Sequence, residues 1–246
     1  MLRSALIKDQ PETDFEGFRY RGLEVTRIEG LTDGVFALAM TLLVLSAEVP
    51  RSYSQLLVLI KDLPSFAVCF ALLMWFWVDH YHYSRRYGLT DRTTIALNSV
   101  LVFVVLFYVY PLKMLFTEVL NEMLYGVSGD ANGPFVQNSQ WPSLFLLYGI
   151  GYASIALVYT AMYLHALRLR TKLDLNAVEI VLTHKSIISA ASRILVAAAS
   201  IACAYVSDKL LPFAGLIYAA TGAIEGVLGW YYRVKLAKLQ AKAPTP

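Results

Sequence analysis

The segment RIEGLTDGVFALAMTLLVL, residues 27–45, begins with three charged side chains and continues as an apolar run that holds one hydroxyl. With about 100° of rotation per residue, a helix here places Leu38, Leu42 and Leu45 on one face and Thr41 beside them. A leucine offers no ligand to an ion, whereas a threonine oxygen can act as a weak one. Thr41 is therefore the side chain of this apolar run that could bind a cation.

Other reactive side chains do not form a recognisable site. Asp79, His80 and His82 suggest a metal site by type, but the two histidines are two residues apart and point in different directions on a helix. His165 and His184 lack the spacing of metal ligands. The sequence has neither a nucleophile motif for Ser/His/Asp catalysis nor a glycine-rich phosphate loop. We therefore predict that the protein is not an enzyme and has no metal and no cofactor.

The composition is that of an integral membrane protein. Hydrophobic residues make up 57% of the 246 residues and charged residues only 16%, against about 25% charged residues in a typical soluble domain. Cys69 and Cys203 both lie in apolar runs, which is typical of small buried side chains and not of a disulfide framework. Residues 1–23 are polar and lack the apolar stretch of a signal peptide, so we expect no cleaved leader.

Six segments have the character of membrane-spanning helices, which need about 20 mostly apolar residues. They lie near residues 26–46, 63–81, 94–117, 143–167, 187–206 and 210–232. The alternating pattern of a transmembrane barrel is absent, and residues 50–60 are interpreted as an interfacial helix before the second span. The predicted fold class is an all-α integral membrane protein with six transmembrane helices in a single domain over residues 1–246.

The basic residues alternate between the two sides of these spans. The N-terminal segment, the second and fourth connections and the C-terminal tail together hold 16 of the 21 Lys and Arg residues. The connection 118–142, on the opposite side, holds none. The positive-inside rule therefore places both termini in the cytoplasm, with residues 1–23 and 234–246 as the cytoplasmic segments of a multi-pass protein of the cell membrane.

Several polar residues of the first half of the chain resemble the endolysosomal potassium channel family. Residues 27–34 resemble the Arg-x-x-x-Phe-Ser-Asp-Gly signature of that family, with Leu31 in the place of Phe and Thr32 in the place of Ser. The stretch FWVDHYHY, at the end of the second span, resembles its Trp-x-x-His-His-x-x-Phe pattern at Trp77 and His80.

The third span continues this resemblance. Asn98 and Pro111 are similar to the Leu-Asn and Leu-Pro signatures of the family, so the ordered resemblance covers roughly residues 27–115. Tyr81 departs from the pattern, because it stands where the family has its second His, and Tyr110 stands in place of Leu before the proline. One set of six spans resembles the prokaryotic form of the family. This form implies a homotetramer around four copies of the first helix, in the inner membrane of a bacterium.

The resemblance maps the pore constriction of the family onto Leu38, Leu42 and Leu45. Four copies around one axis would stack leucine rings that narrow a pore and gate it by dewetting. Thr41 is then the candidate for selectivity, and Glu48, one turn beyond Leu45, is the candidate for concentrating cations at the outer mouth. Because the sequence has no TVGYG-type carbonyl filter, we expect only a modest preference for potassium over sodium. The expected partners are potassium and other monovalent cations, the lipid bilayer and further copies of the chain, with no nucleic acid.

Polar residues near the cytoplasmic half are expected to form a structural network. Its members are Arg27, Thr32, Asp33, Trp77, His80 and Asn98. An ionisable group inside a span costs about 2.5 kcal/mol or more at the centre of the bilayer, so Asp33, roughly two turns into the first helix, needs a partner. We expect Arg27, Asp33 and His80 to pair directly or through intermediates, which would tie the first helix to its own bundle.

Two further charges lie inside predicted spans. Arg193 in the fifth span and Glu225 in the sixth have opposite signs and are expected to pair, within one protomer or between two. Together with Asp33 and His80, they leave open a second function, that of a secondary transporter or proton-coupled cation exchanger. Broken helices and inverted repeats would favour a transporter, and neither is evident in the sequence. A potassium-permeable cation channel is therefore the first prediction.

Overall fold

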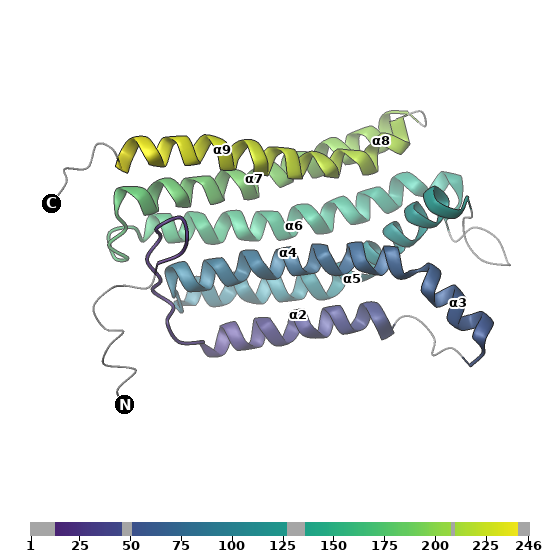
Figure 1. Ribbon diagram of the computed structural model, residues 1–246, viewed down its shortest axis with the longest axis horizontal. Coiled ribbons are helices and arrows are strands. Elements are labelled where there is room, and N and C mark those ends of the chain that lie inside the picture. Colours follow the sequence, from purple (N-terminus) through teal and green to yellow (C-terminus); the bar gives the residue numbers. More distant parts are fainter. Residues whose placement is uncertain (1–12, 46–50, 127–135, 208–209, 241–246) are drawn as a thin grey trace.

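The computed structural model describes residues 13–45, 51–126, 136–207 and 210–240, which form an all-helical bundle. The long helices run side by side, from α2 on one side of the bundle to α9 on the other (Figure 1). The α-helices are α2 (Arg27–Leu45), α3 (Tyr53–Lys61), α4 (Leu63–Tyr87), α5 (Arg92–Tyr125), α6 (Trp141–Arg168), α7 (Ala177–Val206), α8 (Leu211–Leu216) and α9 (Ala220–Gln240). Short 3-10 turns lie at Asn138–Gln140 and Ile217–Ala219.

Five helical stretches of the described residues are long and apolar enough to cross a membrane. They are Leu63–Tyr87, Arg92–Tyr125, Trp141–Arg168, Ala177–Val206 and Phe213–Lys238, and they match the second to sixth predicted spans. The first predicted span is helical too, as α2, but is not among these five. Three charged residues occupy the first two turns of α2, which leaves it a shorter apolar stretch than its neighbours have.

Several helices extend beyond the predicted spans because their ends are capped by polar residues and glycine. The second span was predicted to end at residue 81, but α4 continues to Tyr87, where the N–H of Gly88 bonds to the carbonyl of Ser84 at 2.9 Å. Gly88 has φ of 57°, the left-handed conformation that ends many helices. α7 starts at Ala177, ahead of the predicted 187, because Asn176 and Glu179 form a capping box.

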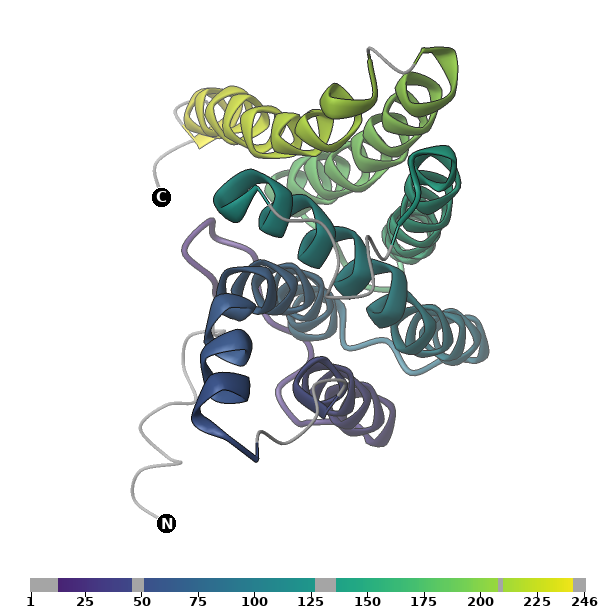
Figure 2. The ribbon, with the colours of Figure 1, turned by 90° about the vertical axis from the view of Figure 1, so that its right-hand side faces the viewer.

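The bundle leaves its two outer helices with few neighbours. α2 packs on α4 and α5, whereas α9 packs chiefly on α7. Figure 2, an end view, shows α2 and the α8–α9 segment at opposite edges of the bundle. Between them lies a core rich in buried tyrosines: Tyr83, Tyr87, Tyr108, Tyr148 and Tyr159. α2 therefore keeps one face open along its length.

Candidate functional site

α2 has one buried face and one open face. The buried face carries Thr32, Phe36, Ala39 and Leu43, each at most 1% exposed. The open face carries Leu31, Leu38, Thr41 and Val44, all of them exposed. An apolar stripe of this kind must be covered by lipid or by another protein.

The structure places the predicted constriction residues at different positions on α2. Leu38 is 50% exposed and lies on the open face. Leu42 is half-buried against the core and lines a groove of about 380 Å³ with Val109 and Tyr110 of α5. Leu45 belongs to the helix, but its side chain lies outside the described part, as does the whole of Glu48. Leu38 and Thr41 are thus the predicted pore residues that the described structure places on the open face.

The hydroxyl of Thr41 has a fixed orientation. Its Oγ1 donates a hydrogen bond to the carbonyl of Ala37, one turn earlier, at 2.8 Å. The hydroxyl proton therefore points back along the helix, while the oxygen keeps lone pairs that no described residue uses. An oxygen in this state can accept from water or bind a cation.

The predicted network exists as two separate pairs. Trp77 of α4 donates its indole N–H to Asp33 Oδ1 of α2 at 2.8 Å. His80 Nε2 and Asn98 Oδ1 lie 2.8 Å apart and join α4 to α5. Thr32 bonds within its own helix, to the carbonyl of Ile28 at 2.9 Å. The first pair therefore holds α2 on α4, and the second holds α4 on α5.

Arg27 is not part of this network. Its side chain is exposed, and within the described ranges it forms no ion pair and no hydrogen bond. The reason is helical geometry: Arg27 and Asp33 are six residues apart, so their side chains point about 120° away from each other around the helix axis. The partner of Asp33 is the indole of Trp77.

A capping box starts α2. The backbone N–H of Glu29 donates to the hydroxyl oxygen of Thr26 at 3.3 Å, and the backbone N–H of Thr26 donates to the Glu29 carboxylate at the same distance. Glu29 is only 5% exposed. The Thr-x-x-Glu spacing is the signal in the sequence that could have revealed this cap.

Lys113 caps the opposite end of α2. Its ammonium group donates to the backbone carbonyl of Leu43 at 3.0 Å. The last carbonyls of a helix lack partners within the helix, and a cation near them is favoured by the helix dipole. Nothing in the spacing of the sequence indicated this contact, because Lys113 belongs to α5.

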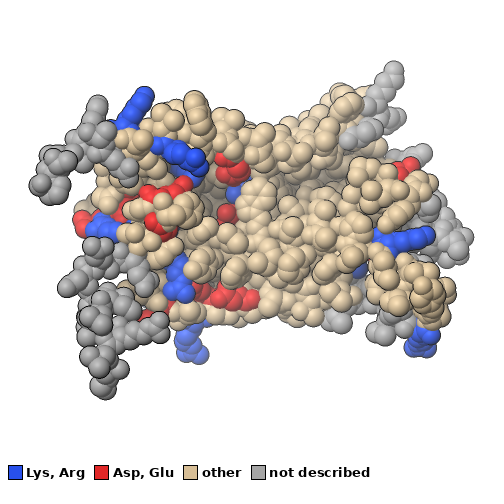
Figure 3. Space-filling view, in the orientation of Figure 1, with Lys and Arg blue, Asp and Glu red and all other residues tan. Residues whose placement is uncertain are grey.

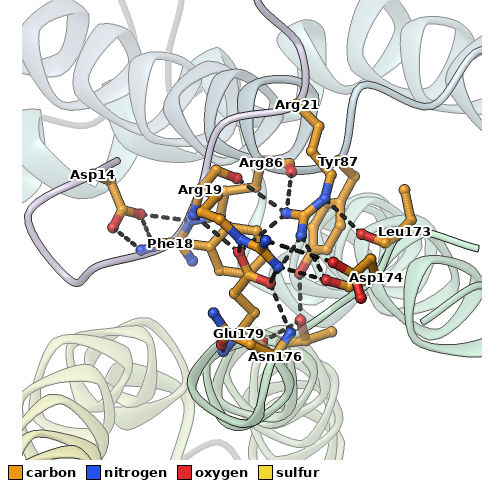
Figure 4. Close-up of polar contacts among 11 residues, drawn as sticks. Asp14, Phe18, Arg19, Arg21, Arg86, Tyr87, Leu173, Asp174, Asn176 and Glu179 are labelled. Atoms are coloured by element: carbon orange, nitrogen blue, oxygen red, sulfur yellow. Dashed lines mark hydrogen bonds and ion pairs between the residues drawn. The ribbon is translucent and has the colours of Figure 1, made fainter. Parts of the chain in front are cut away.

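The segment that leads into α2 is fastened to the ends of α4 and α7 (Figure 4). Arg19 Nε and Arg21 Nη2 bind the carboxylate of Glu179 at 2.9 and 2.8 Å, and Glu179 is fully buried. The N–H groups of Arg21 and Gly22 both donate to the carbonyl of Arg85, at 3.0 and 3.1 Å. A Cβ on Gly22 would lie 2.3 Å from the carbonyl oxygen of Ser84, so only glycine permits this crossing.

A second ion-pair cluster continues this fastening. Arg86 bonds to Asp14 Oδ2 at 2.6 Å and to Glu16 Oε2 at 2.8 Å, and Lys185 of α7 also pairs with Glu16. Burial opposes the ionisation of Glu16, but the hydrogen bonds from Lys185 and Arg86 outweigh it and lower the pKa of this carboxyl. The N-terminal segment is thereby held by charge on both α4 and α7.

The predicted pairing of Arg193 with Glu225 occurs within the chain, at 3.2 Å. Arg193 also pairs with Asp79 of α4, and its guanidinium lies 5.0 Å from the ring centre of Trp75. Figure 3 shows charged side chains gathered toward the end of the bundle where α2 starts, some of them in a hollow. The charged trio Asp79, Arg193 and Glu225 lines a mixed-charge cavity of about 640 Å³ at this end, between α4, α7 and α9. The carboxylates of Asp79 and Glu225 supply counter-charge to the guanidinium of Arg193, whose side chain is only 5% exposed.

The described residues offer no other cluster of ligands. No three His, Cys, Asp or Glu side chains in these ranges gather as a metal site would require. Cys69 is buried, Cys203 is half-buried, and both are free thiols, so the two do not form a disulfide.

The comparisons with known proteins agree with the resemblance seen in the sequence. Residues 27–108 match the family model described as the endosomal/lysosomal potassium channel TMEM175. The chain is 41% identical over 177 residues to a protein named potassium channel from Marivirga tractuosa, covering 70% of this chain and 71% of that protein. A potassium channel of Chamaesiphon minutus is 32% identical over 151 residues, covering 58% of this chain and 66% of the relative.

Solved structures show the same fold. A crystal structure of a variant of the potassium channel MtTMEM175, in complex with a nanobody–MBP fusion protein, superposes with a TM-score of 0.75 at 35% identity. The match covers 87% of this chain and 96% of the other. A TMEM175 homologue from Chamaesiphon minutus, described as a lysosomal potassium-selective channel homologue, has a TM-score of 0.53 at 22% identity, which supports the fold alone. The chain is therefore a multi-pass membrane protein that belongs to the TMEM175 family of potassium channels, in its single-repeat prokaryotic form.

Proposed function

We propose that four copies of this chain form a potassium-permeable cation channel, with α2 of each copy lining a central pore. The observation that carries the proposal is the open face of α2, where Leu38 and Thr41 are exposed although the helix is firmly attached on its other side. One helix cannot enclose a pore, so the proposal requires an oligomer. A tetramer brings four such faces to one axis.

In this arrangement the bundle crosses the membrane six times, with α2 as the first span. The contacts at both ends of α2 support this role. The Thr26–Glu29 capping box and the Trp77–Asp33 bond hold the inner half, while Lys113 holds the outer end. The described N-terminal segment and the end of α9 lie at the same end of the bundle (Figure 1), as six spans require. The basic residues of both segments support a cytoplasmic location for this end, and the membrane that we propose is a bacterial inner membrane.

The leucine and threonine side chains of α2 have different roles in the proposed pore. Leu38, with Leu42 and Leu45 nearby, forms an apolar constriction that water leaves easily, which closes the pore to ions at rest. Thr41 supplies an oxygen whose proton is committed to Ala37, so four such oxygens can replace part of the hydration shell of a cation. Weak hydroxyl ligands give a modest preference for potassium over sodium. Glu48 remains the candidate for concentrating cations at the outer mouth.

Potassium flux from liposomes tests this proposal. Leu38→Ala should raise the flux, because it widens an apolar ring, while Leu157→Ala should not change it. Leu157, on α6, is a matched control because it is 59% exposed yet belongs to a helix outside the pore. Thr41→Val keeps the shape of the side chain and should reduce the discrimination of potassium over sodium in reversal potentials.

Two results would refute the proposal. A stable, active monomer in mild detergent would exclude a pore lined by α2. A flux that stops when a second ion is withdrawn would indicate a coupled transporter in place of a channel.

A further inference from the structure

The mixed-charge cavity between α4, α7 and α9 is separate from the proposed pore, since none of the described residues that line it belongs to α2. Its volume of about 640 Å³ is that of a ligand pocket. Figure 3 views the bundle from the side and shows acidic and basic side chains in a hollow of this face. Because the three helices around the cavity are candidate membrane spans, a hollow on the side of the bundle lies against lipid.

The inner part of the cavity carries one negative charge more than it has positive charges. Asp79 and Glu225 both bind the guanidinium of Arg193, so two carboxylates share one cation. The side chains of the two acids are 19% and 27% exposed, which leaves part of each carboxylate open to the cavity. Ser189 also donates its hydroxyl to Glu225, but this bond adds no charge. A cationic group in the cavity would balance the inner part.

The mouth of the cavity, nearer the end of the bundle where α2 starts, carries a cation without a counter-ion. Arg233 lies eight residues after Glu225 on α9, about 12 Å along the helix axis. It is exposed, and in the described part of the chain no carboxylate pairs with it. Side chains on a helix lean toward its N-terminus, so Arg233 leans toward Glu225. Two other cations of the mouth, Arg86 and Lys185, are already bound to Glu16.

This separation of charge is complementary to a zwitterion. A simple anion would meet the inner carboxylates, and like charges side by side are unfavourable. A simple cation would balance the inner part but would leave Arg233 without a counter-ion. A ligand with an ammonium group and a phosphate a few bonds apart satisfies both ends at once, because the long arginine side chain reaches inward to meet it.

We propose that this cavity binds the head group of an aminophospholipid, such as phosphatidylethanolamine. The ammonium group donates to the carboxylates of Asp79 and Glu225, and the phosphate accepts from the guanidinium of Arg233. Charged pockets between membrane helices recognise lipid head groups in this way. The acyl chains lie along α9, where Val227 and Trp230 are 64% and 68% exposed. The site does not depend on the proposed pore.

Native mass spectrometry of the full chain in mild detergent tests the site with two short-chain lipids. Dioctanoyl phosphatidylethanolamine carries both charges of the head group, whereas dioctanoyl phosphatidylglycerol carries the phosphate alone. The wild type should bind the ethanolamine lipid about tenfold more tightly, the value of a hydrogen bond to a charged group. Glycerophosphoethanolamine, which has the same head group but no acyl chains, should bind more weakly than the ethanolamine lipid because it buries no alkyl surface.

Two substitutions separate the two ends of the head group. Glu225→Gln keeps the shape of the side chain and leaves one carboxylate for one guanidinium, so it should remove the preference for the ethanolamine lipid. Arg233→Gln should weaken the binding of both lipids about tenfold and keep the preference. Lys235→Gln is the matched control and should change neither affinity, because Lys235 is an exposed cation of the same helix that does not line the cavity.

Gly229→Leu tests the cavity itself. Gly229 lines the cavity, and a Cβ there meets no atom within 4 Å, so a leucine occupies the space of the ligand without a clash. This variant should lose the binding of both lipids, whereas Gly222→Leu, at an equally open glycine of α9 that does not line the cavity, should keep it.

Three results would overturn the proposal. The first is equal affinity of the wild type for the ethanolamine and glycerol lipids. The second is an unchanged preference in Glu225→Gln, since the ammonium group would then bind elsewhere. The third is binding of glycerophosphoethanolamine as tight as that of the ethanolamine lipid, because the ligand would then be a soluble compound and not a lipid.

Discussion

Replacing Glu179 by Gln should loosen the N-terminal segment from the bundle. The Glu179 carboxylate is fully buried and accepts from the guanidinium groups of Arg19 and Arg21, at distances of 2.8 to 3.2 Å. It also accepts from the backbone N–H of Asn176, at 2.9 Å, within the capping box of α7. Glutamine keeps the shape of the side chain, but it removes the charge and turns an amide N–H₂ toward guanidinium groups that can only donate.

The size of the effect follows from burial. Removing one partner of a buried ion pair costs about 3–5 kcal/mol, because the other charge remains desolvated. The side chains of Arg19 and Arg21 are 33% and 18% exposed, so water compensates for part of this loss. We therefore expect the free energy of unfolding to fall by about 3 kcal/mol, at the lower end of that range. For a chain of this size, such a loss lowers the midpoint of thermal unfolding by roughly 6–12 °C.

The control is an ion pair of the same arginine on the surface. Asp174 lies 3.6 Å from Arg19 with a side chain that is 94% exposed, and such pairs contribute about 0–1 kcal/mol. Asp174→Asn is preferred to alanine because residue 174 has φ of 48°, which asparagine tolerates. Thermal unfolding in mild detergent, followed by tryptophan fluorescence, compares the two variants. If Glu179→Gln lowers the midpoint no more than Asp174→Asn does, the buried ion pairs do not hold this segment.

Three further predictions concern single contacts. Trp77→Phe should lower the free energy of unfolding by about 1.5–3 kcal/mol, the value of a hydrogen bond to a charged group. Asp33→Asn keeps an acceptor for the indole N–H and should lower it less. A smaller loss for Trp77→Phe than for Asp33→Asn would contradict the assigned pair. Burial opposes the ionisation of Asp91, but hydrogen bonds from Thr94 and His165 outweigh it and lower its pKa from 3.8 to about 2. The ionised carboxylate therefore stabilises the fold above pH 4, and this contribution is lost as the pH falls toward 2. Asp91→Asn should make the free energy of unfolding depend less on pH between pH 4 and 2. An unchanged dependence on pH would refute the assignment. Lys113→Met should speed hydrogen exchange in the last turn of α2, measured by mass spectrometry, and unchanged exchange would show that the lysine does not cap it.

Local signals in the sequence predicted the helices and one ion pair between two of them. The alternation of apolar and polar stretches gave the helices, and the opposite signs of Arg193 and Glu225 indicated a pair that the structure confirms. Arg27 was expected to pair with Asp33 and His80, directly or through intermediates, but among the described residues no hydrogen bond or ion pair joins its exposed side chain to either of them. Six residues along a helix separate two side chains by about 120°.

Contacts between distant segments had no such signal. Asp79, third member of the charged trio, lies 114 residues from Arg193, and Glu179 lies 160 residues from Arg19. No periodicity or motif connects positions so far apart. Their pairing depends on how the helices are arranged around the tyrosine core, which only the packed bundle defines.

By itself, the sequence determined that this is a helical membrane protein with a charged entrance to its first helix, because apolar length and charge placement act locally. The family followed from the order of a few polar residues between Arg27 and Pro111. Only the tertiary structure decided which face of α2 stays open, since that depends on where α4 and α5 pack. It also decided that Asp33 binds Trp77. These features arise from side chains of different helices, and their distances are set by packing, which no single segment of the sequence encodes.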